Sequence, residues 1–168
     1  SANPMSPMVL WMVVGCPAER LGVELPKGGE GSISAEDLQR DVYALTRSEA
    51  GRGDAFARRM EQMHPAPEHA DGRVCAMRGG AGAPRVLVAA WTDTVPDATA
   101  AAVLISIAKG WDGTAPPTRT TWLCLARAGA TLPEGEVAAA PVVNADRIEA
   151  VDYRGLRDKT QQYFRSLE

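Results

Sequence analysis

Carboxylate side chains follow two apolar runs of the sequence. Asp93 and Asp97 come soon after the run at residues 85–91, and Asp146 follows the run at residues 138–144. Such runs predict strands covered on both faces, and sites in α/β proteins form at the carboxyl ends of such strands. These carboxylates could hold a metal ion, or they could accept hydrogen bonds from backbone N–H groups. We favour the second role for Asp93 and Asp146, because aspartate commonly bonds the local backbone in turns.

Trp91 ends the first of these apolar runs. An indole at this point either fills the core or forms an aromatic wall for a ligand. Core filling is favoured, because tryptophan is largely buried on average. The candidate binding residues are therefore Trp91, Asp93 and Asp146, in a cleft after the central strands.

Other catalytic arrangements find little support in the sequence. His64 and His69 lie in a proline-rich segment that predicts a solvated loop, and there is no G-x-S-x-G motif for a serine nucleophile. The three cysteines form no C-x-x-C pair, which argues against a disulfide framework and against a thiolate zinc site. Cys75 and Cys124 lie within apolar runs and are predicted to be buried, unreactive free thiols.

Two further motifs are assigned structural roles. The glycine-rich segment at residues 79–82 precedes a strand rather than a helix, so it predicts a turn and not a phosphate-binding loop. Arg52, Arg58 and Arg59 are predicted to form a solvated helix face.

The spacing of apolar residues predicts helices that alternate with strands. Helices are expected from Ser34 to residue 45, from Asp54 to residue 63, from Asp97 or Thr99 to residue 109, and over residues 153–167. Strands are expected at residues 73–77, 85–91, 120–125 and 138–144. This alternation predicts a three-layer α/β/α domain with a mostly parallel central sheet.

Composition fits one globular domain. The chain has 168 residues, of which 45% are hydrophobic and 23% are charged. Lysine and arginine number 18 against 21 aspartates and glutamates, a net charge of −3, so the charge gives no reason to expect nucleic acid as a partner. No stretch approaches the roughly 20 apolar residues that a transmembrane helix needs.

Residues 1–33 are expected to form an N-terminal strand and loop, ahead of a single α/β domain at residues 34–168. The apolar run at residues 8–14 continues into Gly15 and Cys16, and this ending resembles the processing box of a bacterial lipoprotein. No basic residue precedes the run, as a signal peptide would require, so a buried strand is favoured over a signal remnant. The location therefore stays open between the cell envelope or periplasm, with Cys16 lipidated, and the cytoplasm.

The segment at residues 86–96 is the most specific of several segments that resemble one family in their order. It ends in Asp93, Thr94, Val95 and Pro96, and it resembles the strand and turn "V-V-V-x-A-H-x-D-T-V-P" of zinc exopeptidases of the bacterial leucine aminopeptidase type. That family includes glutaminyl cyclases and non-enzymatic receptor ectodomains. Weaker matches extend the resemblance over roughly residues 32–148, at residues 32–38, 51–53, 98–108, 120–129 and 144–146. The resemblance implies an aminopeptidase-like (phosphorylase/hydrolase-like) fold in truncated form.

Most ligands of that family are replaced in this sequence. The family binds two zinc ions through two histidines, two aspartates and a glutamate, and a further glutamate is the general base. Trp91 stands at the first histidine, Ala98 falls near the bridging aspartate with Asp97 beside it, and residues 126–130 contain no glutamate. Asp146 remains at a ligand position, and Asp93 at an aspartate that supports a ligand. A catalytic zinc needs about three protein ligands and a base to activate water, and neither requirement is met.

The resemblance and its gaps together imply a catalytically inactive, peptidase-like domain, a pseudoenzyme without a cofactor that acts as a protein-interaction or binding module. An end at Glu168 would expose a sheet edge or an apolar face, which a homodimer or a partner protein would cover. One alternative is a zinc-dependent aminopeptidase in which Asp93, Asp97 and Asp146 hold the metal with ligands from a partner chain. Another is a binder of small peptides or amino acids, with Trp91 as the wall of its cleft.

Overall fold

A five-stranded mixed sheet is the centre of the fold. The computed structural model describes residues 28–63 and 66–167. The strands lie in the order β1-β2-β4-β3-β5 across the sheet. Their bounds are β1 Glu68–Ala70, β2 Arg73–Arg78, β3 Gly82–Ala90, β4 Arg119–Ala126 and β5 Glu136–Ala139.

The expected parallel character holds for only half of the sheet. β3 runs parallel to both β4 and β5, whereas β1 and β4 are each antiparallel to β2. The expectation of a mostly parallel sheet was therefore wrong, because a tight turn after β2 reverses the chain into β3. β1 was not predicted, since its three residues are all exposed and carry no apolar pattern. The last strand is β5, which begins and ends earlier than the predicted segment at residues 138–144.

Four helices accompany the sheet, α1 Ala35–Arg47, α2 Arg52–Glu61, α3 Val95–Trp111 and α4 Tyr153–Ser166, with short 3-10 turns at Glu30–Ser32 and Ile148–Ala150. Ser34 begins α1 as predicted, because its hydroxyl accepts a hydrogen bond from the Asp37 N–H. α4 begins at Tyr153, also as predicted, but the other two predicted helix starts were wrong. Thr94 caps α3, and Gly51 rather than Asp54 precedes α2. Among the described residues no helix is long and apolar enough to cross a membrane.

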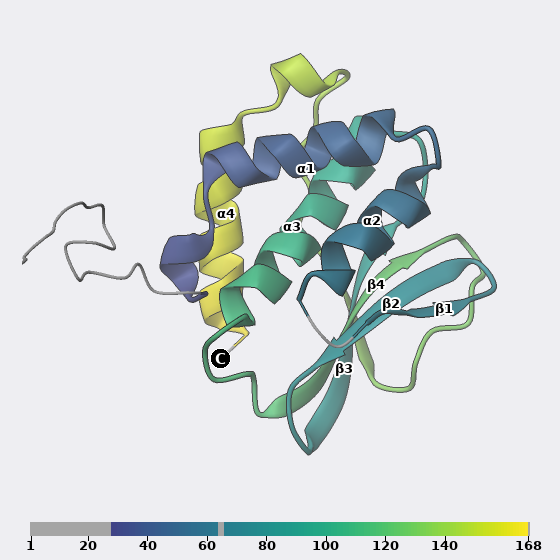
Figure 1. Cartoon of the computed structure of the whole chain (residues 1–168), viewed down its shortest axis with the longest axis vertical. Coiled ribbons are helices and arrows are strands. Elements are labelled where there is room, and N and C mark those ends of the chain that lie inside the picture. Colours follow the sequence, from purple (N-terminus) through teal and green to yellow (C-terminus); the bar gives the residue numbers. More distant parts are fainter. Residues whose placement is uncertain (1–27, 64–65, 168) are drawn as a thin grey trace, which may run out of the picture.

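All four helices lie on one side of the sheet (Figure 1). The main core forms between them and the sheet, where alternate strand residues such as Leu87, Leu123 and Leu125 face the helices. α3 is central, because it contacts the other three helices as well as β3 and β4. The predicted third layer is not present among residues 28–63 and 66–167, where the architecture is two-layered.

The opposite face of the sheet, here called the outer face, carries a small apolar cluster. Its members are Cys75, Val86 and Cys124, which are buried, and Val88, Trp122 and Leu132, which are partly buried. Val137 of β5 pairs with Val86 of β3 and so belongs to the same face, and its side chain is 56% exposed. No helix covers this face in the described part of the chain.

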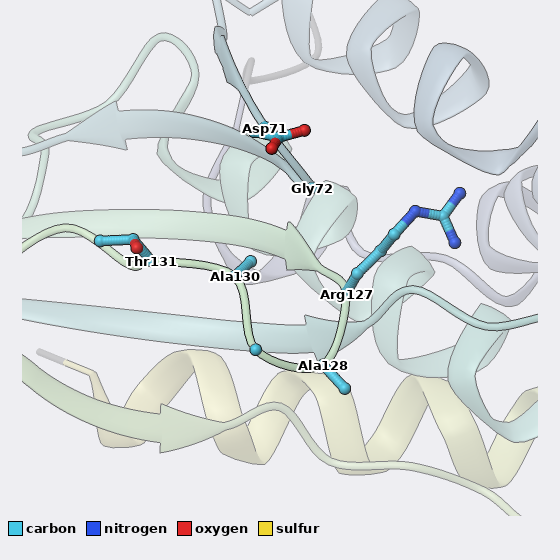
Figure 2. Close-up of a pocket in the computed structure, with 7 residues that line it drawn as sticks. Asp71, Gly72, Arg127, Ala128, Ala130 and Thr131 are labelled. Atoms are coloured by element: carbon cyan, nitrogen blue, oxygen red, sulfur yellow. The ribbon is translucent and has the colours of Figure 1, made fainter.

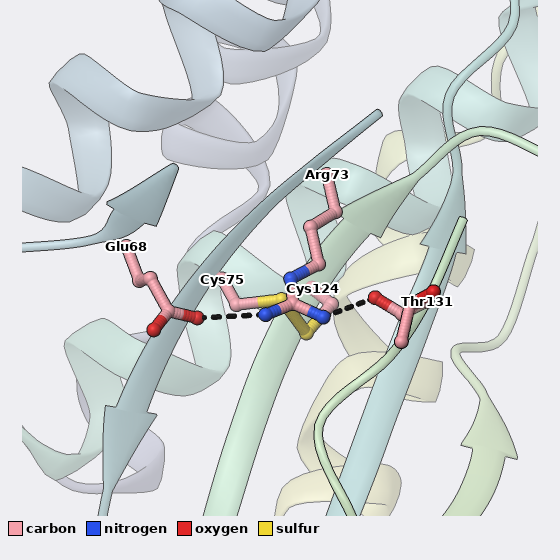
Figure 3. The surroundings of a disulfide bond; sticks show 5 residues. All are labelled: Glu68, Arg73, Cys75, Cys124 and Thr131. Carbon is pink, nitrogen blue, oxygen red and sulfur yellow. Dashed lines mark hydrogen bonds and ion pairs between the residues drawn. A yellow bond between two sulfur atoms is a disulfide. The ribbon is translucent and has the colours of Figure 1, made fainter. Parts of the chain in front are cut away.

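A disulfide bond joins Cys75 to Cys124 within the outer face (Figure 3). The two residues lie directly opposite each other on antiparallel β2 and β4, with their Cα atoms 4.1 Å apart. The guanidinium of Arg73 lies beside the bond and donates to the Thr131 carbonyl and to Glu68. The prediction of two free thiols was therefore wrong, because the pairing of β2 with β4 brings cysteines 49 residues apart into contact.

The predicted strand at residues 8–14 and Cys16 lie outside the described residues, as does His64. His69 is exposed on β1.

Candidate functional site

A buried arginine organises the loop that follows β3. Arg52, the first residue of α2, is only 7% exposed. Its guanidinium donates hydrogen bonds to the carbonyls of Leu45 (3.1 Å), Thr92 and Thr94 (2.9 Å). The sequence had placed Arg52 on a solvated helix face with Arg58 and Arg59. That holds for Arg58 but was wrong for Arg52, and Arg59 is only partly exposed and pairs with the buried Asp41. The side chain instead joins the end of α1 to the segment between β3 and α3.

The same guanidinium lies within electrostatic range of two predicted site residues. Burial lowers the pKa of Arg52, while the carboxylates of Asp93 and Asp97 act in the opposite direction. The two aspartates therefore lie within electrostatic range of the buried cation, whose hydrogen bonds go to backbone carbonyls. Asp97 also accepts a hydrogen bond from the Thr92 hydroxyl, which ties it to the same loop.

The three aspartates of the alternative zinc site are not brought together. Among residues 28–63 and 66–167 no group of three or more histidine, cysteine or acidic side chains could hold a metal ion. Asp93 is exposed in the loop before α3, and Asp146 is exposed in the segment between β5 and α4. A zinc site needs about four ligands in a compact geometry, and a buried Arg52 beside Asp93 and Asp97 opposes a second cation. As the described structure places them, Asp93, Asp97 and Asp146 do not fit a zinc ion.

Trp91 is held from two sides at the carboxyl end of β3. Its ring packs against the main core, and the guanidinium carbon of Arg127 lies 4.1 Å from the ring centroid. On the α2 side, a Cβ atom at Gly53 would lie only 2.3 Å from the ring, so only glycine leaves room for the indole at that position. The indole therefore packs against the core and stays partly exposed.

Trp91 also lines a cleft on the outer face. The cleft has a volume of about 300 Å³ and lies at the carboxyl ends of the parallel strands β3 and β4. Its lining consists of Val88, Ala90, Trp91, Thr92, Ala126, Leu132 and the loop at residues 127–130. Trp91 thus borders both the core and this cleft. Asp93 and Asp146 do not line this cleft.

The loop at residues 127–131 also lines a second cleft. Figure 2 shows the loop crossing the strand ends, with the Arg127 side chain extending away from Ala130 and Thr131. The second cleft, of about 290 Å³, is lined by this loop together with Asp71 and Gly72. The Arg127 N–H donates to the Gly72 carbonyl at 2.8 Å, and the Ala130 N–H donates to the Arg127 carbonyl at 3.1 Å, so the loop is anchored to the β1–β2 turn.

Sequence reasoning did not identify Arg52, Arg127 or Leu132 as parts of the site. Arg52 and Arg127 are separated by 75 positions from one another along the chain, and both meet the Trp91 region only after the sheet forms. The Gly-Arg-Gly segment at residues 51–53 was a usable signal, because glycines on both sides of an arginine at a helix start indicate a close approach of another element.

Comparisons with known proteins return no family. No protein-family model, no curated protein and no solved structure matches this chain.

Proposed function

We propose that this chain is a non-catalytic binding domain related to the aminopeptidase-like zinc exopeptidases. The observation that carries the proposal is the position of the buried Arg52 guanidinium beside Asp93 and Asp97. A hydrolytic zinc centre concentrates negative donors around a dication, whereas here a buried protein cation lies within electrostatic range of the carboxylates. The strand and turn at residues 86–96 and the helix that follows, which carry the resemblance, are present as β3, the Thr92–Thr94 segment and α3.

Binding through the outer face of the sheet is the first candidate role. Val88, Trp122 and Leu132 are only partly buried there, and Val137 is more than half exposed on the edge strand β5. Edge strands and contiguous apolar surfaces of this kind pair with other chains unless something covers them. A homodimer or a partner protein is the proposed cover.

A small-molecule binding role is the second candidate, and the cleft beside Trp91 supports it. Its volume is at the lower end of the range for ligand pockets, and its lining is mostly apolar with few polar groups. Such a cleft suits a small ligand, as the amino-acid or short-peptide alternative requires.

The Cys75–Cys124 disulfide bears on where the domain works. Structural disulfides persist in oxidising compartments and are rare in the cytoplasm. Of the locations left open by the sequence, we therefore favour the cell envelope or periplasm. Mass spectrometry of the native N-terminus would report whether Cys16 carries a lipid.

Zinc titration and a peptidase assay test the lack of catalysis. The purified full chain is assayed with leucine p-nitroanilide, with and without added zinc, beside Asp93→Asn and Asp146→Asn variants. We expect no zinc-dependent cleavage, and calorimetry should give the same weak zinc binding for all three proteins. Stoichiometric zinc that is lost in Asp93→Asn, together with metal-dependent cleavage, would contradict the proposal and favour the hydrolase alternative.

A further inference from the structure

Arg127 differs from most arginines of this chain in the groups that its guanidinium contacts. Arg40, Arg58 and Arg59 pair with carboxylates. Arg127 instead lies over the Trp91 ring, and its guanidinium makes no hydrogen bond or ion pair with any of residues 28–63 and 66–167. Stacking on an indole leaves the N–H groups at the guanidinium edge available to an acceptor.

Arg127 is exposed, and among the described residues no acidic side chain lines the cleft with it. Apart from Arg127, its lining is apolar or small, and Thr92 supplies the single side-chain hydroxyl. Asp71 lines the neighbouring cleft but forms no ion pair with Arg127. A ligand that complements this cleft must therefore present one anionic group beside an apolar body.

We propose that the cleft between Trp91, Arg127 and Leu132 binds a small apolar carboxylic acid. This inference rests on the proposed binding role and names its ligand class. The carboxylate would accept hydrogen bonds from Arg127, whose planar guanidinium matches a carboxylate in a two-bond geometry. The apolar body would lie against Val88, Ala90 and Leu132 on the outer face.

The size of the cleft limits the ligand. A volume of about 300 Å³ corresponds to roughly ten water molecules at their share of the liquid. That space suits a short aliphatic acid or one apolar residue with a free carboxyl group. Both ligands combine a carboxylate with an apolar body, and the experiment below distinguishes a free aliphatic acid from a peptide C-terminus.

The test uses nuclear magnetic resonance titrations of the full chain with four probes. Hexanoate and hexanamide have the same apolar body and differ in charge, and N-acetyl-leucine and N-acetyl-leucinamide form the same pair for a peptide C-terminus. We expect both acids to shift the indole N–H of Trp91 and to bind more tightly than their amides. Tighter binding of N-acetyl-leucine would identify a peptide C-terminus as the ligand, and tighter binding of hexanoate a free aliphatic acid, and either supports the shared chemistry.

The same titrations on three variants test whether the probes bind in this cleft and contact Arg127. Arg127→Gln removes the charge and should weaken binding of the acids by about tenfold, the lower end for a hydrogen bond to a charged group, while leaving the amides unchanged. Arg147→Gln is the matched control, since Arg147 is exposed, lies outside the cleft lining and carries the same charge. Ala90→Phe fills the cleft from an exposed position and should weaken binding of all probes.

Several results would overturn the inference. These are equal binding of acids and amides, no shift of the Trp91 resonance up to 20 mM probe (roughly the weak limit for a fragment of this size), or equal effects of Arg127→Gln and Arg147→Gln. None of them depends on peptidase activity, so a failure here is distinct from the zinc-dependent cleavage that would contradict the proposed lack of catalysis.

Discussion

The Arg52 side chain fixes the loop after β3 by hydrogen bonds to its backbone. Its guanidinium is buried, yet it contacts carbonyls from two different segments, at Leu45 and at Thr92 and Thr94. Removing the guanidinium would leave these carbonyls without their donor and would take away a positive charge within electrostatic range of Asp93 and Asp97. An unpaired buried polar group costs about 1–3 kcal/mol, more when charge is involved.

We predict that Arg52→Met lowers the free energy of unfolding by about 3 kcal/mol, because three carbonyls lose a donor in a partly buried position. Urea denaturation followed by circular dichroism measures the change. Arg58→Met is the matched control, since Arg58 is mostly exposed and pairs only with Asp54, and it should change stability by less than about 0.5 kcal/mol. Equal effects of the two variants would show that Arg52 does not organise the loop.

The disulfide between β2 and β4 acts at the level of elements. β2 lies between the edge strand β1 and the central strand β4, so the bond ties the antiparallel part of the sheet to its parallel part. It closes a loop with a sequence separation of 49 residues that contains β3 and α3. Cross-linking a loop of this length reduces the entropy of the unfolded chain.

We predict that Cys75→Ala/Cys124→Ala lowers the free energy of unfolding by up to about 4 kcal/mol, the chain-entropy value for a loop of this length. Denaturation is measured with and without a phosphine reductant. The reductant should destabilise the wild-type chain once it unfolds and leave the double variant unaffected. If the reductant shifts the midpoints of both proteins equally, the bond does not contribute to stability as proposed.

At the scale of the whole molecule, the two faces of the sheet differ in what covers them. The helices gather on one face of the sheet (Figure 1). The outer face carries the disulfide cluster, the cleft and the exposed Val137 on edge strand β5. This asymmetry places the proposed interaction surface and the proposed ligand cleft side by side. Occupancy of one could therefore affect the other.

If the outer face mediates a homodimer, Val137→Asp should disrupt it, because a carboxylate would be placed within an apolar contact at the sheet edge. Light scattering coupled to size-exclusion chromatography should give a dimer for the wild-type chain and a monomer for the variant. Val142→Asp is the control, since Val142 is 40% exposed but lies outside the sheet. A wild-type chain that is monomeric at all concentrations would contradict the homodimer.

The sequence by itself determined the elements whose signals are local. The spacing of Leu38, Val42 and Leu45 predicted α1, and the structure buries all three. The Ser34 cap was predicted correctly, because a capping hydroxyl bonds an N–H only three residues away. The central strands β2, β3 and β4 were also found, since each is marked by an apolar run of strand length.

Only the tertiary structure decided what depends on pairing between distant segments. The contact of Cys75 with Cys124 follows from the antiparallel register of β2 on β4, which neither strand encodes alone. The burial of Arg52 and the stacking of Arg127 on Trp91 arise because the ends of α2, β3 and β4 meet at one edge of the sheet. Periodicity reports whether a residue is covered, but the identity of the covering element is set by the arrangement of the whole chain.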